Sequence, residues 1–358
     1  MARIACFTSF TYAYLARARV LAESLRRLHP DWSLTALVTD RPPPNLPATA
    51  LDCFDHVQDA AALGIPDFPA WLFKHDLVEA CTAVKATMLR RLLERGAEKV
   101  IYLDPDIAAF APLTPLVDRL DAASLLLTPH QLAPDTTPEQ VRDNEGGSLR
   151  YGIYNLGFLG VRNDPTGRAF AAWWEERLHA ACYDAPEAGI FTDQKYCDLV
   201  PGLFPGVHIT RDPGCNVASW NIARRPVRIT PRGEVTAAGR LLRFYHFTKI
   251  APEGARAAGD TMTERHAGEN YEIHELVAWY KRAIAAAELP EAAGHPWHYA
   301  SFADGTAIPR AARLLWRDRA DLRRAFADPF HPAQYRAWLA AHQPATLGIE
   351  PPASDTPA

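Results

Sequence analysis

The sequence predicts an α/β fold in which helices flank a parallel sheet, with a helical extension after it. Apolar, β-prone runs alternate with helical periodicity early in the chain, beginning with Arg3–Phe7, Leu15–Leu28 and Ser33–Thr39. This strand–helix–strand order implies parallel strands joined by a right-handed crossover. A further run, Val100–Leu103, is continuously apolar, which is typical of a strand buried on both faces. From about Ala251 onward, polar connectors and helical patterns predict the extension.

The remaining elements follow from the same periodicities, with strands expected at Phe54–Val57, Ser124–Thr128, Tyr151–Val161, Val207–Ile209 and Leu241–Phe247. Helices are expected at Leu77–Arg95, Gly167–Ala181, Thr192–Leu199, Glu272–Glu288, Ile308–Phe326 and Ala333–His342, with Thr192 or Asp193 as an N-cap. Two polar stretches are expected to lack regular structure: His130–Arg150, as a lid beside a site, and Ala251–Asn270, as a connector. We divide the chain into a domain over 1–250, an extension over 251–342 and a disordered tail over 343–358.

Composition excludes several classes of protein. The 358 residues are 48% hydrophobic and 22% charged, with a net charge of −4, which is typical of a globular protein of one large or two moderate domains. Basic residues are scattered along the chain, so we expect no nucleic-acid partner. A negatively charged substrate must therefore meet a local site.

The cysteines and the N-terminus indicate a cytoplasmic protein. The six cysteines form no CxxC pair and most lie in apolar surroundings, as reduced core residues do. The N-terminal residues enter a strand directly, without the apolar stretch of a signal peptide. No apolar run approaches the ~20 residues of a membrane-spanning helix. Peripheral contact with the inner face of the membrane is left open.

Two carboxylates follow the buried strand, at Asp104 and Asp106, with Pro105 between them. In an extended chain, residues i and i+2 point to the same side. Ligands of open α/β sheets bind beyond the carboxyl ends of strands, so this is an expected place for chemistry. Adjacent carboxylates repel unless a cation lies between them, and a divalent ion is the simplest candidate. The alternative is an Asp-Pro turn with a solvated second Asp.

The first strand and the later helix 77–95 offer residues that could hold a nucleotide. The turn Thr8–Tyr14 is rich in hydroxyls but lacks GxGxxG and Walker patterns, so a nucleotide would be held by hydroxyls, backbone and ring stacking. Tyr12 or Tyr14 either stacks on a base or packs the start of the helix. Lys85 either neutralises a phosphate at the rim of the sheet or lies on the surface with its aliphatic stem packed.

Two polar residues interrupt apolar strands. Asn155 lies in a strand with three glycines, and glycines in strands mark bulges or the close approach of a ligand. Its amide needs hydrogen-bond partners, from the backbone or from a bound polar molecule. His246 interrupts the last strand, with Lys249 just after it; the imidazole is either a satisfied core residue or a ligand.

Four segments in this order resemble those of GT-A-fold glycosyltransferases, most closely family 8 and its bacterial relatives: 101–107 (IYLDPDI), 154–163 (YNLGFLGVRN), 191–201 (FTDQKYCDLVP) and 244–249 (FYHFTK). The resemblance covers about residues 3–250. It implies a Rossmann-like GT-A domain with a mixed, mostly parallel sheet flanked by helices. It also implies that this domain transfers a sugar from a nucleotide donor, expected to be UDP-linked, with retention of configuration. It also implies a Mn²⁺ or Mg²⁺ cofactor and an acceptor that is a glycan, a lipid-linked sugar or a protein.

The same resemblance implies roles for individual residues. The metal ligands would be Asp104, Asp106 and His246. Donor-binding residues would be Thr8, Tyr12, Lys85, Asp104, Asn155, Gly157 and Lys249, and Asp193 and Gln194 would be catalytic residues that hold the donor sugar. The chain departs from the family after His246: the expected HxxGxxKPW reads HFTKIAP, without the glycine and with Lys249 too early.

The chemistry of nucleotide sugars agrees with these roles. Charge grows on the departing diphosphate and a divalent ion stabilises it, while the sugar gains oxocarbenium character that a carboxylate such as Asp193 can stabilise. Because Gln194 is a poor nucleophile, we favour front-face attack by the acceptor hydroxyl over a covalent intermediate.

Three other functions compete with this interpretation. A nucleotidyltransferase acting on sugar phosphates would need a glycine-rich basic loop, and a haloacid-dehalogenase-type phosphatase would need its acids near the first strand; neither pattern is present. A non-catalytic nucleotide- or glycan-binding module is the third. In the extension, Trp279, Trp297, Trp316 and Trp338 form an acceptor platform, make a dimer contact or, as we prefer, pack in a core.

Overall fold

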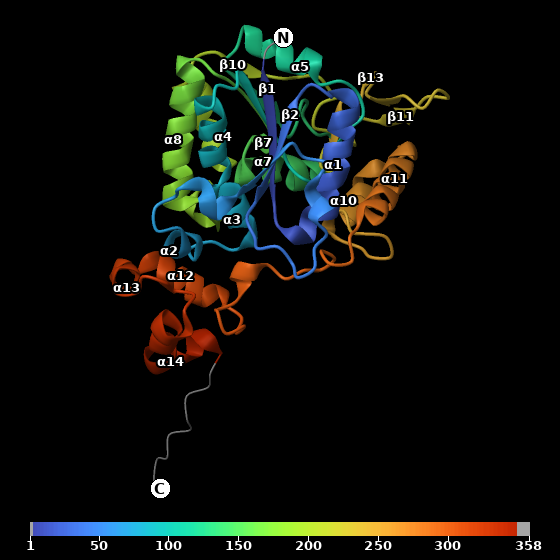
Figure 1. Ribbon diagram of the computed structural model, residues 1–358. Helices are drawn as coiled ribbons and strands as arrows, with labels where there is room; N and C mark the ends of the chain where they lie inside the picture. The colour runs from blue at the N-terminus through green and yellow to red at the C-terminus, as the bar shows by residue number, and fades with distance from the viewer. Residues whose placement is uncertain (1–2, 349–358) are drawn as a thin grey trace.

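A seven-stranded sheet lies at the centre of the computed structural model, which describes residues 3–348 (Figure 1). Its spatial order is β10-β6-β7-β4-β1-β2-β3. The strands are β1 (Ile4–Phe10), β2 (Ser33–Val38), β3 (His56–Asp59), β4 (Lys99–Leu103), β6 (Leu125–Pro129), β7 (Tyr154–Arg162) and β10 (Val207–Ile209). All neighbours are parallel except β7, which runs antiparallel to both β4 and β6. The predicted mixed, mostly parallel sheet is confirmed.

Helices cover both faces of this sheet. In Figure 1, α4 and α8 lie on one side and α1 on the other. Successive side chains of β1 point to opposite faces of the sheet, so this apolar strand contributes to both cores. Phe7 packs in the cluster under α4 and α8, whereas Cys6 packs in the cluster under α1. The helices of this body are α1 (Leu15–Leu28), α2 (Phe68–Leu72), α3 (Leu77–Ala83), α4 (Lys85–Glu94), α5 (Thr114–Val117), α6 (Pro138–Gln140), α7 (Gly146–Tyr151), α8 (Pro165–Ala181) and α9 (Val200–Leu203).

Several short strands form small sheets beside the main one: β5 (Ile107–Ala109) with β14 (Phe244–His246), β8 (Asp184–Ala185) with β9 (Ile190–Phe191), and β11 (Val227–Ile229) with β12 (Val235–Ala237) and β13 (Arg240–Leu241). The single last strand predicted over Leu241–Phe247 is therefore wrong, because its two ends belong to different sheets. The antiparallel pair β5–β14 places His246 opposite Ile107, next to Asp106.

Some predicted segments differ from the structure. The long helix over 77–95 breaks at Val84, so that α4 begins at Lys85. The predicted loop His130–Arg150 is largely helical, and the predicted connector Ala251–Asn270 contains a helix, Ala258–Ala267. Single-turn 3₁₀ and π segments fill many of the connections: Tyr12–Tyr14, Ala48–Leu51, Ala60–Leu63, Asp118–Asp121, Val141–Glu145, Pro186–Ala188, Lys195–Leu199, His298–Ala300, Pro332–Arg336 and Pro344–Leu347.

The C-terminal helices pack in two places. The helices α10 (Ala258–Ala267) and α11 (Glu272–Ala287) share a core with the body, where Tyr280 stacks on Phe247 at 3.8 Å between ring centroids. The last helices, α12 (Arg310–Asp318), α13 (Ala320–Ala325) and α14 (Ala337–His342), surround a separate cluster below the body in Figure 1. The predicted helix over 308–326 is thus two helices. Trp297 and Trp316 are buried, as the core interpretation predicted.

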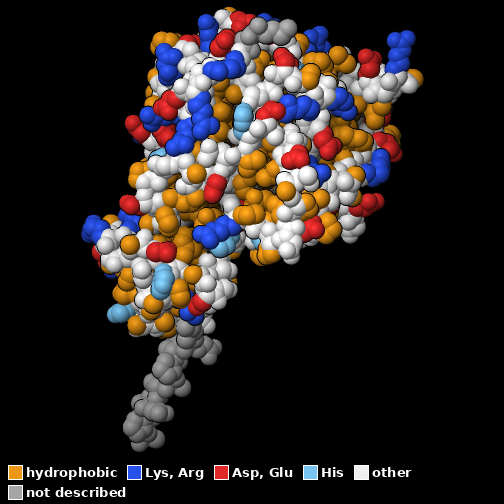
Figure 2. All heavy atoms as spheres, in the orientation of Figure 1, with side chains coloured by type: hydrophobic (Ala, Val, Ile, Leu, Met, Phe, Trp, Pro, Cys, Tyr) orange, Lys and Arg blue, Asp and Glu red, His pale blue; other side chains and the backbone are white. Residues whose placement is uncertain are grey.

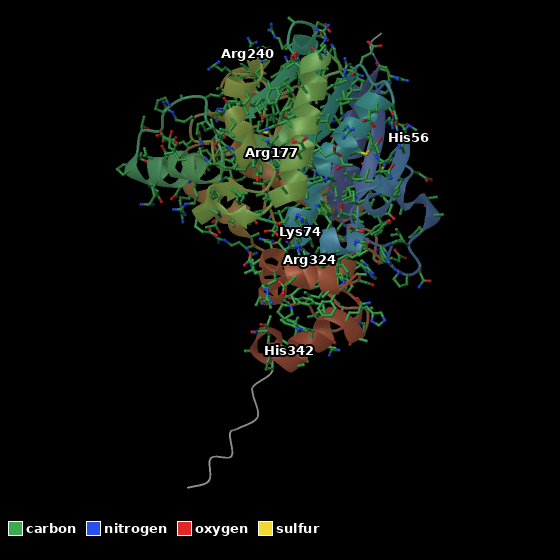
Figure 3. All side chains as sticks on the ribbon, turned by 90° about the vertical axis from the view of Figure 1, so that its left-hand side faces the viewer. His56, Lys74, Arg177, Arg240, Arg324 and His342 are labelled. Carbon is green, nitrogen blue, oxygen red and sulfur yellow. The ribbon has the colours of Figure 1, made fainter. Side chains whose placement is uncertain are left out.

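Arginines of α12 join this cluster to the body. Arg313 donates to the carbonyl oxygens of Phe73 and His75, and Arg317 donates to the carbonyl of Lys74, which Figure 3 labels at the junction. Arg317 also pairs at 2.6 Å with Glu79, whose side chain is 0% exposed. Of the tail predicted to be disordered, Pro344–Leu347 forms a 3₁₀ turn, and residues 349–358 lie outside the described part of the chain.

The surface charges, the helices and the cysteines can be described for residues 3–348. Figure 2 shows Lys and Arg side chains interspersed with Asp and Glu over the visible face, with no continuous field of one sign. Among residues 3–348, no helix has both the length and the apolar composition needed to cross a bilayer. The six cysteines are free thiols.

Candidate metal and catalytic site

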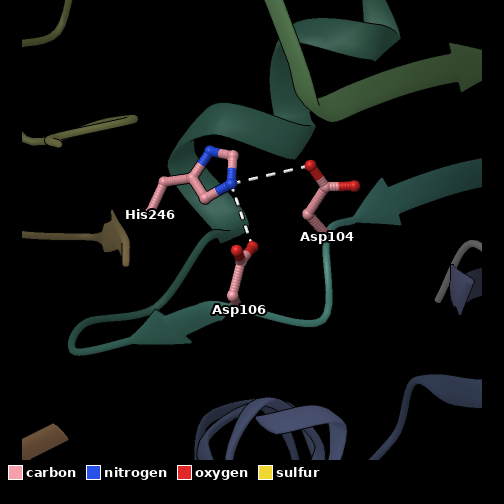
Figure 4. Close-up of side chains that lie close together, drawn as sticks. All are labelled: Asp104, Asp106 and His246. Atoms are coloured by element: carbon pink, nitrogen blue, oxygen red, sulfur yellow. Dashed lines mark ion pairs between the residues drawn. The ribbon is translucent and has the colours of Figure 1, made fainter. Parts of the chain in front are cut away.

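Asp104, Asp106 and His246 converge beyond the carboxyl end of β4 (Figure 4). The Nε2 atom of His246 lies 3.0 Å from Oδ1 of Asp106 and 3.6 Å from Oδ2 of Asp104. One ligand atom from each residue can be chosen so that all three lie within 4.8 Å of one another. The backbone between the two acids is not extended as predicted, because the Ile107 amide donates to the Asp104 carbonyl at 3.1 Å and closes a turn. The two carboxylates nevertheless face the same place, as predicted. This turn leads directly into β5, whose partner strand carries His246.

Asn155 fixes the orientation of the His246 ring. Its Oδ1 accepts hydrogen bonds from Nδ1 of His246 at 3.0 Å and from the Gly157 amide at 3.2 Å. Because an amide oxygen only accepts, Nδ1 of His246 carries a proton, and Nε2 faces the two carboxylates. Gly157 allows this approach, since a Cβ at this position would lie 2.5 Å from Cε1 of His246. The site thus has the outer hydrogen bond that typically orients a metal-binding imidazole.

Asp106 and His246 shift each other's pKa values. Burial alone would raise the pKa of Asp106, but the adjacent His246 outweighs it and holds that pKa below its usual value. Burial alone would lower the pKa of His246, but Asp106 and Asp104 outweigh it and raise that pKa. A cation bound by Nε2 would replace a proton there.

Lys85 occupies the space between two acids from different elements. Its Nζ lies 3.1 Å from Oδ1 of Asp104 and 3.0 Å from Oδ2 of Asp193. The side chain is 3% exposed, so the surface position considered for it is wrong. Burial alone would lower the pKa of Lys85, but the two carboxylates outweigh it and raise that pKa above its usual value. The ammonium group also lies 4.1 Å from the centre of the Tyr102 ring.

Asp193 and Gln194 reach the site by a sharp turn. Thr192 adopts φ +43°, and neither Thr192 nor Asp193 caps the short helix that begins at Lys195, so the predicted N-cap is wrong. Oε1 of Gln194 accepts from the Leu156 amide at 3.1 Å and from Nδ2 of Asn155 at 3.3 Å, and its Nε2 donates to the Tyr151 carbonyl at 3.0 Å. Gln194 therefore continues the hydrogen-bonded chain from His246 through Asn155.

Three other residues predicted to bind the donor, Thr8, Tyr12 and Lys249, lie outside the cluster of acids. Thr8 is in β1, and its buried hydroxyl oxygen has no hydrogen-bond partner among residues 3–348. Tyr12 is buried in an apolar cluster, which favours packing over base stacking for that ring. Lys249 is exposed and adopts φ +54°, and no hydrogen bond or ion pair within residues 3–348 joins its ammonium to the acids. Direct contacts of these residues with a donor stay predictions.

Several residues near the site escaped the sequence analysis. The hydroxyl of Tyr102 donates to Oδ1 of Asp104 at 2.5 Å, which the alternation of side chains along β4 could have indicated. Trp220 lies edge-on to His246, with ring centroids 5.5 Å apart, and comes from a loop with no such pattern.

Asp40, at the end of β2, was also missed. It accepts hydrogen bonds from the amides of Tyr12 and His298, while Trp297 donates to the Thr39 carbonyl at 2.8 Å. The C-terminal segment therefore reaches the same rim of the sheet.

Comparison with known proteins gives the following likenesses. No family model matches the chain. Two uncharacterized proteins of Bacillus subtilis (strain 168) match 48% of it: YfnF, 31% identical over 176 residues, and YfnD, 29% identical over 176 residues. The chain covers only 57% and 53% of these relatives, about half of their length.

Three solved structures, each a glycosyltransferase, are similar to this chain. A galactosyltransferase, LgtC, in complex with donor and acceptor sugar analogues covers 74% of this chain and 95% of its own, with 19% identity and a TM-score of 0.45. The match to mouse xyloside xylosyltransferase 1 covers 70% of this chain and 99% of that protein, with 17% identity and a TM-score of 0.40. The match to a glycosyltransferase involved in glycosylation of the major capsid of PBCV-1 covers 74% of this chain and 99% of that protein, with 13% identity and a TM-score of 0.38.

Proposed function

We propose that this chain is a metal-dependent glycosyltransferase of the GT-A type, similar to family 8, which moves a sugar from a nucleotide donor to an acceptor hydroxyl. The donor is UDP-linked and its anomeric configuration is retained. One observation carries the proposal: Asp104, Asp106 and an oriented His246 meet at the end of β4, directly beside the buried Lys85–Asp193 ion pair.

The three residues suit a divalent cation. Two carboxylates and one neutral imidazole are a donor set that Mn²⁺ accepts, and Mg²⁺ is the alternative. Asp104, whose side chain is 24% exposed, faces the solvent side of the cluster, whereas His246 closes the buried side. When bound, such an ion would neutralise the charge that grows on a departing diphosphate.

The protein's own residues supply positioning and charge. Lys85 ties Asp104 to Asp193, so that the end of β4 and the segment carrying Asp193 keep a fixed relation. We assign to the Asp193 carboxylate the stabilisation of positive charge on the donor sugar in the transition state. Its side chain is 4% exposed, and in such a water-poor site a fixed charge acts strongly.

A front-face displacement fits these groups best. The bond between the anomeric carbon and the leaving oxygen breaks, and the acceptor oxygen forms its bond on the same face. The acceptor proton moves to the departing diphosphate. The amide of Gln194 makes three hydrogen bonds to the protein and is a poor nucleophile, which supports a step without a covalent intermediate.

The test is a panel of nucleotide sugars incubated with the protein and Mn²⁺, with release of nucleoside diphosphate as the readout. We expect turnover of one donor that excess chelator abolishes, and an NMR spectrum of the product that shows the donor's anomeric configuration. Donor binding without turnover would indicate a non-catalytic module, and pyrophosphate release from a nucleoside triphosphate with a sugar phosphate would indicate a nucleotidyltransferase. An inverted product would contradict the retaining mechanism.

A further inference from the structure

A cavity of about 420 Å³ lies apart from the cluster of acids, between α5, the end of β10 and the residues around β13. These three elements are labelled near the top of Figure 1, whereas α12, α13 and α14 lie at the bottom. Arg240, on its wall, is labelled at the corresponding end in Figure 3. The proposed glycosyltransferase chemistry makes no use of this cavity.

The walls of this cavity carry a strong excess of positive charge. Four arginines line it, Arg119, Arg211, Arg240 and Arg243, against one carboxylate, Asp212. Asp212 is already engaged, because its Oδ2 lies 3.5 Å from Nε of Arg243 and its Oδ1 accepts from the Gly214 amide at 2.9 Å. The other three guanidinium groups form no ion pair with any carboxylate in residues 3–348. In a protein with a net charge of −4, this local excess is not a consequence of overall composition.

The field of these arginines extends into the cavity. His208 also lines it, and burial together with Arg119 and Arg211 lowers the pKa of His208 below its usual value. The imidazole therefore offers hydrogen bonds near pH 7 without adding a further cation. Pro115 and Leu116 give the same cavity an apolar side.

We propose that this cavity binds a phosphorylated small molecule that carries at least two negative charges, as a phosphomonoester or a diphosphate does. Guanidinium groups match phosphate oxygens in bidentate geometry, and three unpaired ones from separate segments can surround a single anion. The volume lies within the range of pockets that hold small ligands, and the apolar side can accept the organic part. A free metabolite and a lipid headgroup present the same phosphate chemistry.

The test uses a double variant, Arg211→Gln with Arg240→Gln, because both side chains are exposed and hold no other element in place. Its control is Arg324→Gln, an exposed arginine on α13, which Figure 3 labels below the body and far from Arg240. Inorganic pyrophosphate is titrated calorimetrically in excess chelator, so that the metal-dependent site contributes nothing. A second arm measures flotation of the protein with phosphatidylcholine vesicles that contain or lack phosphatidic acid.

We expect saturable pyrophosphate binding by the unmodified protein and the control, weakened at least tenfold in the double variant. Vesicle flotation that requires phosphatidic acid and is lost in the double variant would also support the site and assign it to a lipid phosphate. Absence of both kinds of binding, or equal binding by the double variant, would overturn the proposal. Donor turnover with Mn²⁺ should be unchanged in the double variant, so failure of this inference and failure of the proposed function are separable.

Discussion

Nζ of Lys85 lies 3.0 Å from Oδ2 of Asp193, and both side chains are almost completely buried. The two residues come from separate elements, the first residue of α4 and the turn before a short 3₁₀ helix. Since Asp104 shares the same ammonium group, this contact connects a proposed metal ligand to a proposed catalytic carboxylate.

Replacing Lys85 by Met should lower both stability and activity. The change leaves two carboxylates near each other without their cation, and breaking a buried pair typically costs about 3–5 kcal/mol. Urea unfolding measures the decrease in the free energy of unfolding. The matched control is Lys281→Met, whose partner Asp260 keeps two backbone donors, from Ala251 and Ala257, so we expect a smaller loss there.

Adding Asp193→Asn to the Lys85→Met variant should restore part of the stability, because it removes one of the unpaired charges. Transfer activity should stay absent in the double variant. If Lys85→Met were as stable as the unmodified protein, the buried pair would not have the importance assigned to it.

Gly157→Ala should weaken metal binding. The new Cβ would lie 2.5 Å from Cε1 of His246, so the ring must rotate away from the two carboxylates. Titration with Mn²⁺, followed by electron paramagnetic resonance, should show at least a tenfold loss of affinity. Gly147→Ala is the control, since a Cβ there meets no atom within 4 Å. Equal affinities in the two variants would contradict the assigned role of His246.

Asn155→Ala should weaken metal affinity by about 10–100-fold, the usual effect of removing an outer partner of a ligating histidine. Asn155→Asp keeps an oxygen that accepts from Nδ1 of His246 and from the Gly157 amide, but loses the donor to Gln194. We therefore expect a smaller loss of Mn²⁺ affinity in the Asp variant. The reverse order of affinities would show that Asn155 does not act through the imidazole.

The C-terminal helices should depend on Arg317. Its replacement by Ala leaves Glu79 buried without its cation, so we expect a loss of about 3 kcal/mol in the free energy of unfolding. Arg324→Ala, which removes an exposed arginine of α13, is the control and should change stability little. A loss no larger in Arg317→Ala than in this control would refute the anchoring role.

The sequence predicted the parts of the site that local patterns encode. The apolar run of β4 fixed the place of Asp104, and the polar interruption at His246 marked a residue that needs a partner. Much of the site residue set came from the resemblance to a known family, because distant residues such as Lys85 and Asp193 carry no local sign that they meet.

Contacts between residues far apart in the sequence explain most of the differences between the predicted and the observed structure. The break before Lys85 and the positive φ of Thr192 lack the glycine or proline that usually marks such points. His246 approaches Asp106 only because β14 pairs with β5 and not with the main sheet, which strand periodicity cannot reveal. The hydrogen bond from His246 to Asn155 depends on the same pairing.

Direct titration of Mn²⁺ in the presence of UDP is the measurement closest to the central claim, made on the unmodified protein and on Asp106→Ala. We predict one ion per chain for the unmodified protein and a loss of affinity of at least a hundredfold in the variant, with its fold intact by circular dichroism. Equal Mn²⁺ binding by the two proteins, or full sugar transfer in excess chelator, would contradict the account.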